Sequence, residues 1–573
     1  MKKTFKRLGA VLLAAFMMLS TMVCASAEDA APAGATTSKT ITLTVNNVSD
    51  GDEVSAYRLV SYKADANGYE FFNGDNHNGF EAYIDANKTN KDLTAEKYLE
   101  SLRSAEVNSL LEGYATACKQ DGATYKLPAG EENVTTVTAA SNKASLTLKP
   151  GYYLLLAKTA STNNRIYTSI AAFVKVDGED LVVYAGDSTN ALTAGSDGAY
   201  AVAAKSADGP TIDKKTNATQ GDGEATWKQT AAAGVGDLVR FYVQVNIPAY
   251  TNVKALNLTV NDTLSNLKYK DGTVKVYDAQ PTLTHEGNTT TVSGTEIKDA
   301  IKKQTIGEYN NGTQKLTFDL DYEKIMNGLQ QAKSVYVYYE TTVQKEAVAE
   351  KKHIGENIAN LTYANAATPD SKYTTDNKDT DVYNYYLNLS KIKDETEASL
   401  KGAKFALYLG NDSNEKIKFV KVPATDTDTE YYRPATAEDA SENIVTDLEA
   451  DFQIRGLDAN TYYVEETQTP SGYYAPEGRF KLEFISKMEN GLHTSKLDGD
   501  KSKMSAVNDA DSHLLLSPAV NSQQAHQFSV GIKNTSTPNL PTTGGAGTML
   551  LSIGGVALMA AGAYLIFFRK KEN

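Results

Sequence analysis

The stretch Leu238–Ile247, LVRFYVQVNI, alternates along its whole length between apolar residues and residues of other kinds. Val239, Phe241 and every second residue after them are apolar, and Pro248 follows directly. Successive side chains of a strand point to opposite faces, so this pattern predicts a strand with one apolar face. Proline has no N–H to donate to a sheet, so the strand is expected to end at Ile247.

The same alternation recurs on both sides of this stretch. The further segments are Ile41/Leu43/Val45, Leu146/Leu148, Val335–Val343, Leu387/Leu389, Phe405/Leu407, Phe452/Ile454 and Phe528/Val530/Ile532. The chain uses 34 tyrosines against 16 phenylalanines and one tryptophan, a balance that suits half-exposed strands. One stretch, Leu93–Lys119, has leucines near helical spacing instead. The sequence therefore predicts an all-β fold with one helical insert.

The chain is too long for one hydrophobic core, because 573 residues normally divide into several domains. Changes in composition and alternation along the chain predict three immunoglobulin-like β-sandwich modules in series, over residues 38–205, 209–384 and 385–535. The helical insert belongs to the first of them. The Asp/Asn/Lys/Thr-rich stretch Asp370–Asp381 is expected to be a connector rather than a strand.

Both ends of the chain carry the pattern of a targeting segment. Four basic residues precede the apolar stretch Leu8–Leu19, and Ala25-Ser26-Ala27 follows, so residues 1–27 are expected to be a secretory signal peptide. Near the other end, residues 549–568 form an apolar run without a charged residue, and Arg569-Lys570-Lys571 comes next. Twenty helical residues span the roughly 30 Å core of a bilayer, so this run predicts a transmembrane helix with a cytoplasmic basic end.

Charge and cysteine usage narrow the class of function. The whole chain has a net charge of −14, which becomes −20 when the leader loses four positive charges and the tail loses three positive and one negative. So acidic an ectodomain argues against nucleic-acid binding. Cys24 leaves with the leader, and Cys118 alone forms no internal disulfide. The six histidines lack metal-ligand spacing and no catalytic motif is present, so we expect no metal, no cofactor and no enzyme.

The peptide Leu540-Pro541-Thr542-Thr543-Gly544 stands just before the apolar run. Together with that run and the basic tail, it resembles the L-P-x-T-G cell-wall sorting signal of Gram-positive surface proteins. The resemblance implies that a sortase cuts between Thr543 and Gly544 and passes the Thr543 carbonyl to an amine. It also implies a secreted protein that is anchored to peptidoglycan at the cell surface.

The third module carries a longer match. Leu387-x-Leu389-x-Lys391 opens it, Tyr462-x-Val464-x-Glu466-Thr467-x-Thr469-Pro470-x-Gly472-Tyr473 lies in the middle, and a last strand ends at Asn534. This pattern resembles the Cna protein B-type domain, whose E-box reads Y-x-L-x-E-T-x-A-P-x-G-Y. The resemblance implies that Lys391 and Asn534 form an isopeptide bond and that Glu466 promotes the reaction.

Burial explains why such residues would react. A lysine amine is protonated at neutral pH, but an apolar site penalises the charged form and lowers its pKa. The same burial keeps a carboxylic acid protonated, so Glu466 is expected to donate to the Asn534 carboxamide oxygen and polarise it. Two adjacent strands are expected to hold amine and carbonyl carbon in contact, which supplies a high effective concentration. The alternative is a buried Lys391–Glu466 ion pair without a bond.

The second module shows a weaker version of this pattern. Lys214 follows Pro210-Thr211-Ile212-Asp213, Asp262 lies mid-module, and Asn357 opens Asn357-x-Ala359-x-Leu361-x-Tyr363. This is similar to the Cna A-type-like central domain of Gram-positive backbone pilins, in which an Asp replaces the Glu. The resemblance assigns the cross-link to Lys214 and Asn357, with Asp262 as the acid. Lys215 and Asn365 remain alternatives, and the first module shows no comparable trio.

Lys205 decides between two functions. Backbone pilins carry a lysine in a motif like V-Y-P-K-N before the second module, and Val202-Ala203-Ala204-Lys205-Ser206 keeps the lysine without the Tyr-Pro. The analogy implies a fimbrial shaft subunit that sortase joins head to tail, with adhesion as its role. The alternative is a monomeric wall-anchored adhesin that uses its isopeptide-linked domains as a stalk. The partners expected are sortase, identical subunits and peptidoglycan, with minor pilins and a host ligand left open.

Overall fold

The computed structural model describes residues 39–536 apart from a set of short gaps. These gaps are 64–67, 72–78, 103, 121–122, 161, 187, 189, 219–224, 251–252, 254, 287–288, 330, 352–353, 394–395, 397, 476–477, 490–491, 500–503 and 507–526. The expected signal peptide (1–27) and sorting signal (540–573), with its apolar run 549–568, therefore lie outside the described residues. Within the described part, no helix is both long and apolar enough to cross a membrane.

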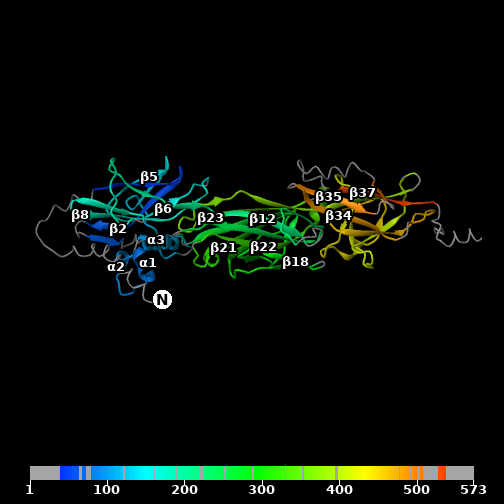
Figure 1. The fold of residues 1–573 in the computed structure, drawn as a ribbon, viewed down its shortest axis with the longest axis horizontal. Coiled ribbons are helices and arrows are strands. Elements are labelled where there is room, and N and C mark those ends of the chain that lie inside the picture. Colours follow the sequence, from blue (N-terminus) through cyan, green and yellow to red (C-terminus); the bar gives the residue numbers. More distant parts are fainter. Residues whose placement is uncertain are drawn as a thin grey trace, which may run out of the picture.

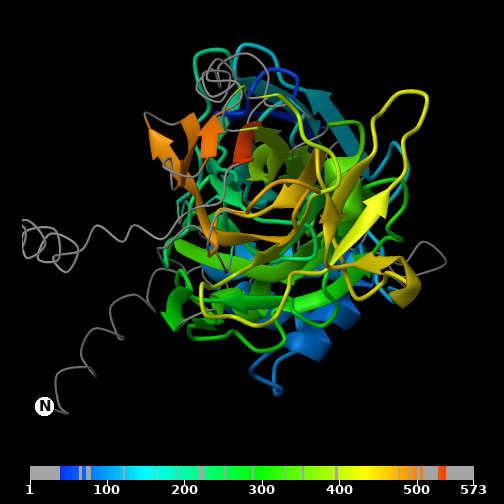
Figure 2. The same ribbon diagram turned by 90° about the vertical axis from the view of Figure 1, so that its right-hand side faces the viewer.

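Three pairs of sheets follow one another along the long axis of the molecule (Figure 1). The first pair is drawn in blue and cyan, the second in green, and the third in yellow to red. Seen end on, the three modules lie over one another, so the molecule is elongated (Figure 2). The predicted all-β class is confirmed, because strands dominate all three modules and helices are few.

The N-terminal module packs a three-stranded sheet on a larger one. The small sheet has the order β10 (Tyr200–Ala203), β1 (Ile41–Asn46), β5 (Lys143–Leu148). The large sheet has the order β3 (Gly68–Phe71), β2 (Glu53–Lys63), β6 (Gly151–Lys158), β8 (Ile170–Asp177), β9 (Asp180–Ala185), and β4 (Val134–Thr138) also pairs with β2. A ribbon of β7 (Arg165–Tyr167) and β11 (Ser206–Asp208) adjoins them.

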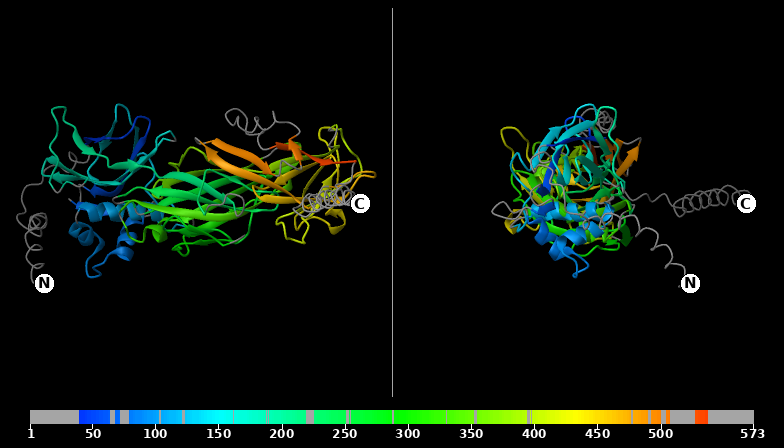
Figure 3. Two further views of the ribbon diagram at one scale, coloured as in Figure 1. Left: turned by 45° about the vertical axis from the view of Figure 1, so that its right-hand side comes forward. Right: turned by 90° about the vertical axis from the view of Figure 1, so that its left-hand side faces the viewer.

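The helical insert of this module differs from the single helix predicted over Leu93–Lys119. It contains α1 (Phe80–Asn87), α2 (Ala95–Ser101) and α3 (Ser104–Cys118). The Thr94 hydroxyl caps α2 by accepting a bond from the Lys97 N–H at 3.3 Å. The helices cover one face of the large sheet (Figure 3) and share a core with β2 and β6. Cys118 ends α3 half-buried, and burial raises the pKa of its thiol to about 11.

The central module is a sandwich of two larger sheets, here called the D sheet and the E sheet. The D sheet holds β12 (Thr211–Ala218), β14 (Leu238–Ile247), β22 (Lys333–Val343), β16 (Leu267–Tyr269) and β17 (Lys275–Tyr277). The E sheet holds β13 (Thr230–Ala232), β25 (Lys378–Tyr383), β23 (Ile354–Asn365), β15 (Leu256–Ser265), β21 (Thr313–Asp321), β20 (Ile301–Ile306) and β24 (Tyr373–Thr374). The module also contains the hairpin β18 (Thr282–Glu286) and β19 (Thr289–Ser293), α4 (Tyr322–Met326) and η1 (Lys345–Lys351).

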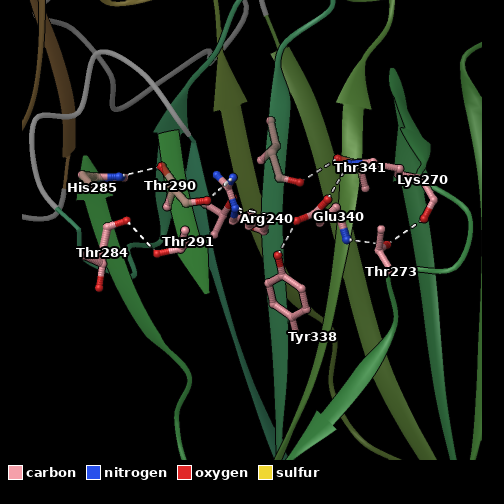
Figure 4. Close-up of polar contacts among 12 residues, drawn as sticks. Arg240, Lys270, Thr273, Thr284, His285, Thr290, Thr291, Tyr338, Glu340 and Thr341 are labelled. Atoms are coloured by element: carbon pink, nitrogen blue, oxygen red, sulfur yellow. Dashed lines mark hydrogen bonds and ion pairs between the residues drawn. The ribbon is translucent and has the colours of Figure 1, made fainter. Parts of the chain in front are cut away.

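The outer face of the D sheet is more covered than the alternating pattern of β14 suggests. Arg240 and Tyr242, expected on the polar face, are both buried. Arg240 donates to the Thr290 carbonyl of the β18–β19 hairpin at 3.2 Å, as Figure 4 shows. Its Nε also lies 3.9 Å from the Glu340 carboxylate, which Tyr338 and Lys270 contact as well (Figure 4). The hairpin therefore contacts Arg240 on this face, and Tyr242 packs against Trp227 at 4.8 Å between ring centres.

The C-terminal module is a sandwich of sheets here called G and H. The G sheet has the order β30 (Ile444–Val445), β28 (Phe419–Val422), β29 (Tyr431–Pro434), β32 (Phe452–Leu457), β26 (Tyr385–Lys393), β37 (Gln527–Asn534), β36 (Met504–Ala506). The H sheet has the order β31 (Leu448–Glu449), β27 (Lys404–Tyr408), β33 (Thr461–Gln468), β34 (Phe480–Glu489), β35 (Leu492–Gly499). A short 3-10 turn, η2 (Ser441–Asn443), precedes β30.

The stretch Asp370–Asp381 is not the connector that its composition predicts. It contributes β24 and part of β25 to the E sheet, where Thr380 is buried. At its start, the Ser371 hydroxyl donates to the Thr159 carbonyl of the N-terminal module at 3.0 Å. Sheet pairing satisfies the backbone of this polar stretch, which overrides its loop-like composition.

Candidate cross-linking sites

Lys214 and Lys391 are the two buried lysines among the residues that the structure describes, and neither has any solvent exposure. Lysine is almost never fully buried in proteins unless it is paired. Both of these lysines sit in the middle of a sandwich, Lys214 on β12 and Lys391 on β26. The burial therefore singles out the same two positions as the sequence motifs.

In the C-terminal module the predicted trio comes together. β26 and β37 are parallel neighbours in the G sheet, and Lys391 stands opposite Ile532, two residues before Asn534, near the ends of the two strands. Glu466 comes from β33 of the facing H sheet, so its carboxylate reaches the pair across the sandwich. The apolar side chains of both sheets surround the site, and the Lys391 amine lies 5.9 Å from the centre of the Phe405 ring.

The contacts of this trio form a closed triangle. The Lys391 amine donates to the Asn534 carboxamide oxygen at 2.6 Å and lies 3.4 Å from the Glu466 carboxylate. The Asn534 carboxamide nitrogen donates to the other Glu466 oxygen at 2.8 Å. The expectation that Glu466 faces the carboxamide oxygen is thus wrong for this conformation, because the nitrogen faces Glu466 and the oxygen faces the amine.

Burial shifts both titrating groups of the trio toward their neutral forms. Desolvation lowers the pKa of Lys391 to about 8, although the nearby Glu466 carboxylate works against it. Desolvation likewise raises the pKa of Glu466, against the opposing effect of Lys391. The neutral amine and the protonated acid are therefore much closer in free energy to the ion pair than they are in water.

The central module uses a different arrangement for its trio. Lys214 lies on β12 of the D sheet, whereas Asp262 (β15) and Asn357 (β23) both lie on the E sheet. The amine and the carboxamide therefore face each other across the sandwich, and the expectation of two adjacent strands is wrong here. Any bond between Lys214 and Asn357 joins the two sheets, whereas one between Lys391 and Asn534 joins two strands of one sheet.

A tyrosine that the motifs do not contain stands in the middle of the central site. The Tyr339 hydroxyl accepts from the Lys214 amine at 3.0 Å and from the Asn357 carboxamide nitrogen at 2.7 Å, and it donates to Asp262 in a very short bond. Lys214 also donates to the same Asp262 oxygen at 2.6 Å. The alternation of β22 places Tyr339 on the inner face with Val337 and Thr341, which is the one signal in the sequence for it.

Burial also acts on the ionisable groups of the central site. Desolvation lowers the pKa of Lys214, while Asp262 opposes this effect. Desolvation and the Asp262 charge together hold the pKa of Tyr339 well above its usual value. The amine lies 5.6 Å from the ring centres of both Phe241 and Tyr339, so aromatic rings line the site. Burial thus favours the neutral phenol and makes the charged amine less stable than it is in water.

Both sites also contain polar atoms without a hydrogen-bond partner among the described residues. These atoms are Asp262 Oδ1, Asn357 Oδ1 and Glu466 Oε2. An unsatisfied buried polar atom costs about 1–3 kcal/mol, and such atoms in a folded protein call for an explanation. Both trios therefore leave hydrogen-bonding capacity unused on the acid, and the central trio leaves it unused on the carboxamide as well.

The alternatives for the central trio lie elsewhere. Lys215 is partly exposed and pairs with Asp213 at 3.1 Å and with Gln229 at 3.0 Å. Asn365 is buried at the boundary with the N-terminal module, where it donates to the Tyr167 carbonyl at 3.0 Å. Neither residue contacts Asp262.

Lys205 is exposed in the short loop between β10 and β11. Both flanking strands are paired in the N-terminal module, β10 with β1 and β11 with β7, and the Lys205 carbonyl accepts from the Thr168 N–H at 3.1 Å. The backbone of this lysine is therefore fixed at the boundary between the first two modules. The sorting peptide Leu540–Gly544 lies outside the described residues.

Comparisons with known proteins agree with the C-terminal motifs. Residues 386–496 match the SpaA family of prealbumin-like fold domains, and residues 532–573 match the LPXTG cell wall anchor motif. No curated protein matches the chain.

Several solved structures of major pilins are similar to the chain at low identity. The T6 backbone pilin of serotype M6 Streptococcus pyogenes is 15% identical with a TM-score of 0.43, over 90% of this chain and 100% of that one. The major pilin SpaD from Corynebacterium diphtheriae is 14% identical with a TM-score of 0.38, over 88% and 100%. BcpA, the major pilin subunit of Bacillus cereus, is 14% identical with a TM-score of 0.35, over 87% and 100%. Scores this low carry no argument about function.

The anchor motif and the matched domain give the chain its class. The motif covers the sorting peptide and the apolar run after it, and the matched domain covers Lys391 and Glu466. The chain is a surface protein that is anchored to the Gram-positive cell wall and carries a SpaA-type prealbumin-like domain.

Proposed function

We propose that this chain is the shaft subunit of a sortase-polymerised surface fimbria. We also propose that isopeptide bonds Lys214–Asn357 and Lys391–Asn534 staple its central and C-terminal modules. The observation that carries the proposal is the contact of the buried Lys391 amine with Asn534 at 2.6 Å, beside the Glu466 carboxylate at 3.4 Å. The wall anchor and the serial modules support it, because a shaft needs length and resistance to tension.

The proposed reaction in the C-terminal module moves protons through Glu466. The Lys391 ammonium first gives a proton to Glu466, and the neutral amine attacks the Asn534 carboxamide carbon. Glu466 passes that proton to the carboxamide nitrogen, which it already contacts at 2.8 Å, and takes a second proton from the newly bonded lysine nitrogen. The old carbon–nitrogen bond breaks and ammonia leaves. Contact between the reacting groups replaces a bimolecular encounter.

Polymerisation uses a second amine. Sortase would hold the Thr543 carbonyl as an acyl-enzyme after Gly544 leaves, and the Lys205 amine of the next subunit would attack it, forming an amide and releasing the enzyme. The exposure of Lys205 and its fixed backbone support this role. Each repetition adds one subunit in the same orientation, which gives an open head-to-tail polymer. The chain itself performs only the two single-turnover staple reactions.

The formation of covalent polymers in the cell wall tests this function. Wall extracts of cells that carry the natural chain should give a high-mass ladder on a denaturing gel, and Lys205→Ala should abolish it. Lys215→Ala is the matched control, since it removes a surface lysine of the neighbouring module, and the ladder should persist. A single band from the natural chain would contradict the shaft and favour a monomeric wall-anchored adhesin, in which the same modules form a stalk.

A further inference from the structure

We propose that the Tyr339 hydroxyl is a catalytic proton relay for the Lys214–Asn357 bond, and that Asp262 acts on the leaving nitrogen only through it. This inference rests on the proposed cross-linking function. It explains how an acid one methylene shorter than glutamate serves a site in which the reacting groups belong to opposite sheets.

The contacts place the hydroxyl between the acid and both reacting nitrogens. It lies 3.0 Å from the Lys214 amine and 2.7 Å from the Asn357 carboxamide nitrogen, and it donates to Asp262. All four side chains are nine-tenths or more buried, so no bulk water competes for these positions. A phenol both donates and accepts, and it therefore transmits a proton in either direction.

The register of the E sheet shows why Asp262 needs a relay. Asp262 stands directly opposite Ala359 in the pairing of β15 with β23, so Asn357 is its diagonal neighbour. Diagonal neighbours in a sheet are roughly 7–8 Å apart, and the hydrogen bonds of Asp262 go to Lys214 and Tyr339 rather than to Asn357. In the C-terminal module Glu466 crosses the sandwich and contacts Asn534 itself at 2.8 Å. Asp262 and Tyr339 together thus perform the proton transfer that Glu466 performs alone in the C-terminal module.

The reaction balances with the groups present. The Lys214 ammonium gives a proton to Asp262 across 2.6 Å, and the free amine attacks the Asn357 carboxamide carbon. Tyr339 gives its proton to the carboxamide nitrogen and recovers one from Asp262. Asp262 then takes the surplus proton from the lysine nitrogen as the carbonyl re-forms and ammonia leaves. Tyr339 ends unchanged, Asp262 ends protonated, and the net loss is one ammonia.

Packing alone does not account for a tyrosine at this position. The ring of Tyr339 stacks against Phe241 at 5.7 Å and lies 5.9 Å from Phe318, so phenylalanine would fill the same space. A phenol at the centre of a sandwich costs desolvation unless its hydroxyl is bonded. Its neighbour Tyr338 points to the opposite face of β22 and donates to Glu340 at 2.7 Å (Figure 4). Tyr338 is therefore a matched control on the same strand.

The test follows both bonds in one molecule. The chain is recovered unfolded and unlinked from inclusion bodies and diluted into refolding buffer, and each joined peptide pair is quantified over time by mass spectrometry after digestion. Tyr339→Phe should slow formation of the Lys214–Asn357 bond by about 100-fold or more, the usual contribution of a positioned proton donor. The Lys391–Asn534 bond in the same molecules should form at its parental rate, and Tyr338→Phe should slow neither bond.

Formation of the Lys214–Asn357 bond at the parental rate in Tyr339→Phe would overturn the relay while leaving the cross-link intact. Absence of that bond from the parent chain would instead overturn the cross-link and the relay with it. If protease resistance shows that Tyr339→Phe does not fold, a difluorotyrosine at position 339 keeps the shape and has a more acidic hydroxyl. The relay predicts a faster reaction with this residue, and an unchanged rate would refute it.

Discussion

Lys391 and Glu466 show at the scale of single residues how a fold changes chemistry. Both charges are less stable there than in water, because burial lowers the pKa of the lysine to about 8 and raises that of the acid. The pair shares its protons, so its two pKa values belong to the pair and not to either residue. The form that reacts, neutral amine with protonated acid, holds one proton in total, as the ion pair does.

The rate of Lys391–Asn534 bond formation should therefore depend on pH in a definite way. It should be flat while the pair holds one proton, and it should fall about tenfold per pH unit above the pKa of about 8, where that proton is lost. The measurement is the refolding and digestion assay at a series of pH values. A rate that rises up to this pKa and stays level above it would show that deprotonation of Lys391 alone matters and that Glu466 is no proton carrier.

The sequence predicted the members of both trios but not their geometry. The E-box spacing and the strand-end Asn534 were enough to name Lys391, Glu466 and Asn534. The orientation of the Asn534 carboxamide depends on which neighbours approach it from two sheets, and no local pattern encodes that. Tyr339 escaped prediction for a related reason, since an inward tyrosine in an alternating strand is read as core.

At the scale of elements, the junction between the central and C-terminal modules is tightly packed. Arg455 on β32 is fully buried, forms a two-pronged ion pair with Asp428, and lies 3.9 Å over the Tyr431 ring. Beside it, the Val235 N–H of the central module donates to the Gly456 carbonyl at 2.9 Å. This junction was not predictable, because it is built from single residues in unrelated loops and strands.

Gly456 should be indispensable to this junction. Its φ is +86°, and an added Cβ would meet Val235 at 2.6 Å and Val348 at 2.9 Å. Gly456→Ala should therefore expose the Val235 amide and speed its hydrogen exchange. Gly472→Ala is the control, because φ there is +83° with nothing within 4 Å, so it adds backbone strain without a clash. Equal protection of Val235 in the two variants would show that the junction does not depend on this contact.

At the scale of the whole molecule, resistance to tension depends on both the modules and the junctions between them. The order of modules followed from composition and alternation. The stretch Asp370–Asp381 was wrongly predicted to be a linker because its residues are polar, whereas sheet pairing satisfies its backbone groups. By the loop-entropy argument for disulfides, closing a loop of ~100 residues contributes about 4.7 kcal/mol. The larger effect is kinetic, since tension cannot extend a segment whose ends are covalently joined.

The accurate mass of the soluble portion, residues 28–543, reports directly whether the isopeptide bonds have formed. Two isopeptide bonds predict a mass lower by two ammonia molecules than the sum of the residues. After correction for the substitution, Glu466→Ala and Asp262→Ala should each be one ammonia heavier than the parent, while Glu465→Ala, next in sequence to Glu466, should match it. A parent mass equal to the simple sum of its residues would show that neither bond forms.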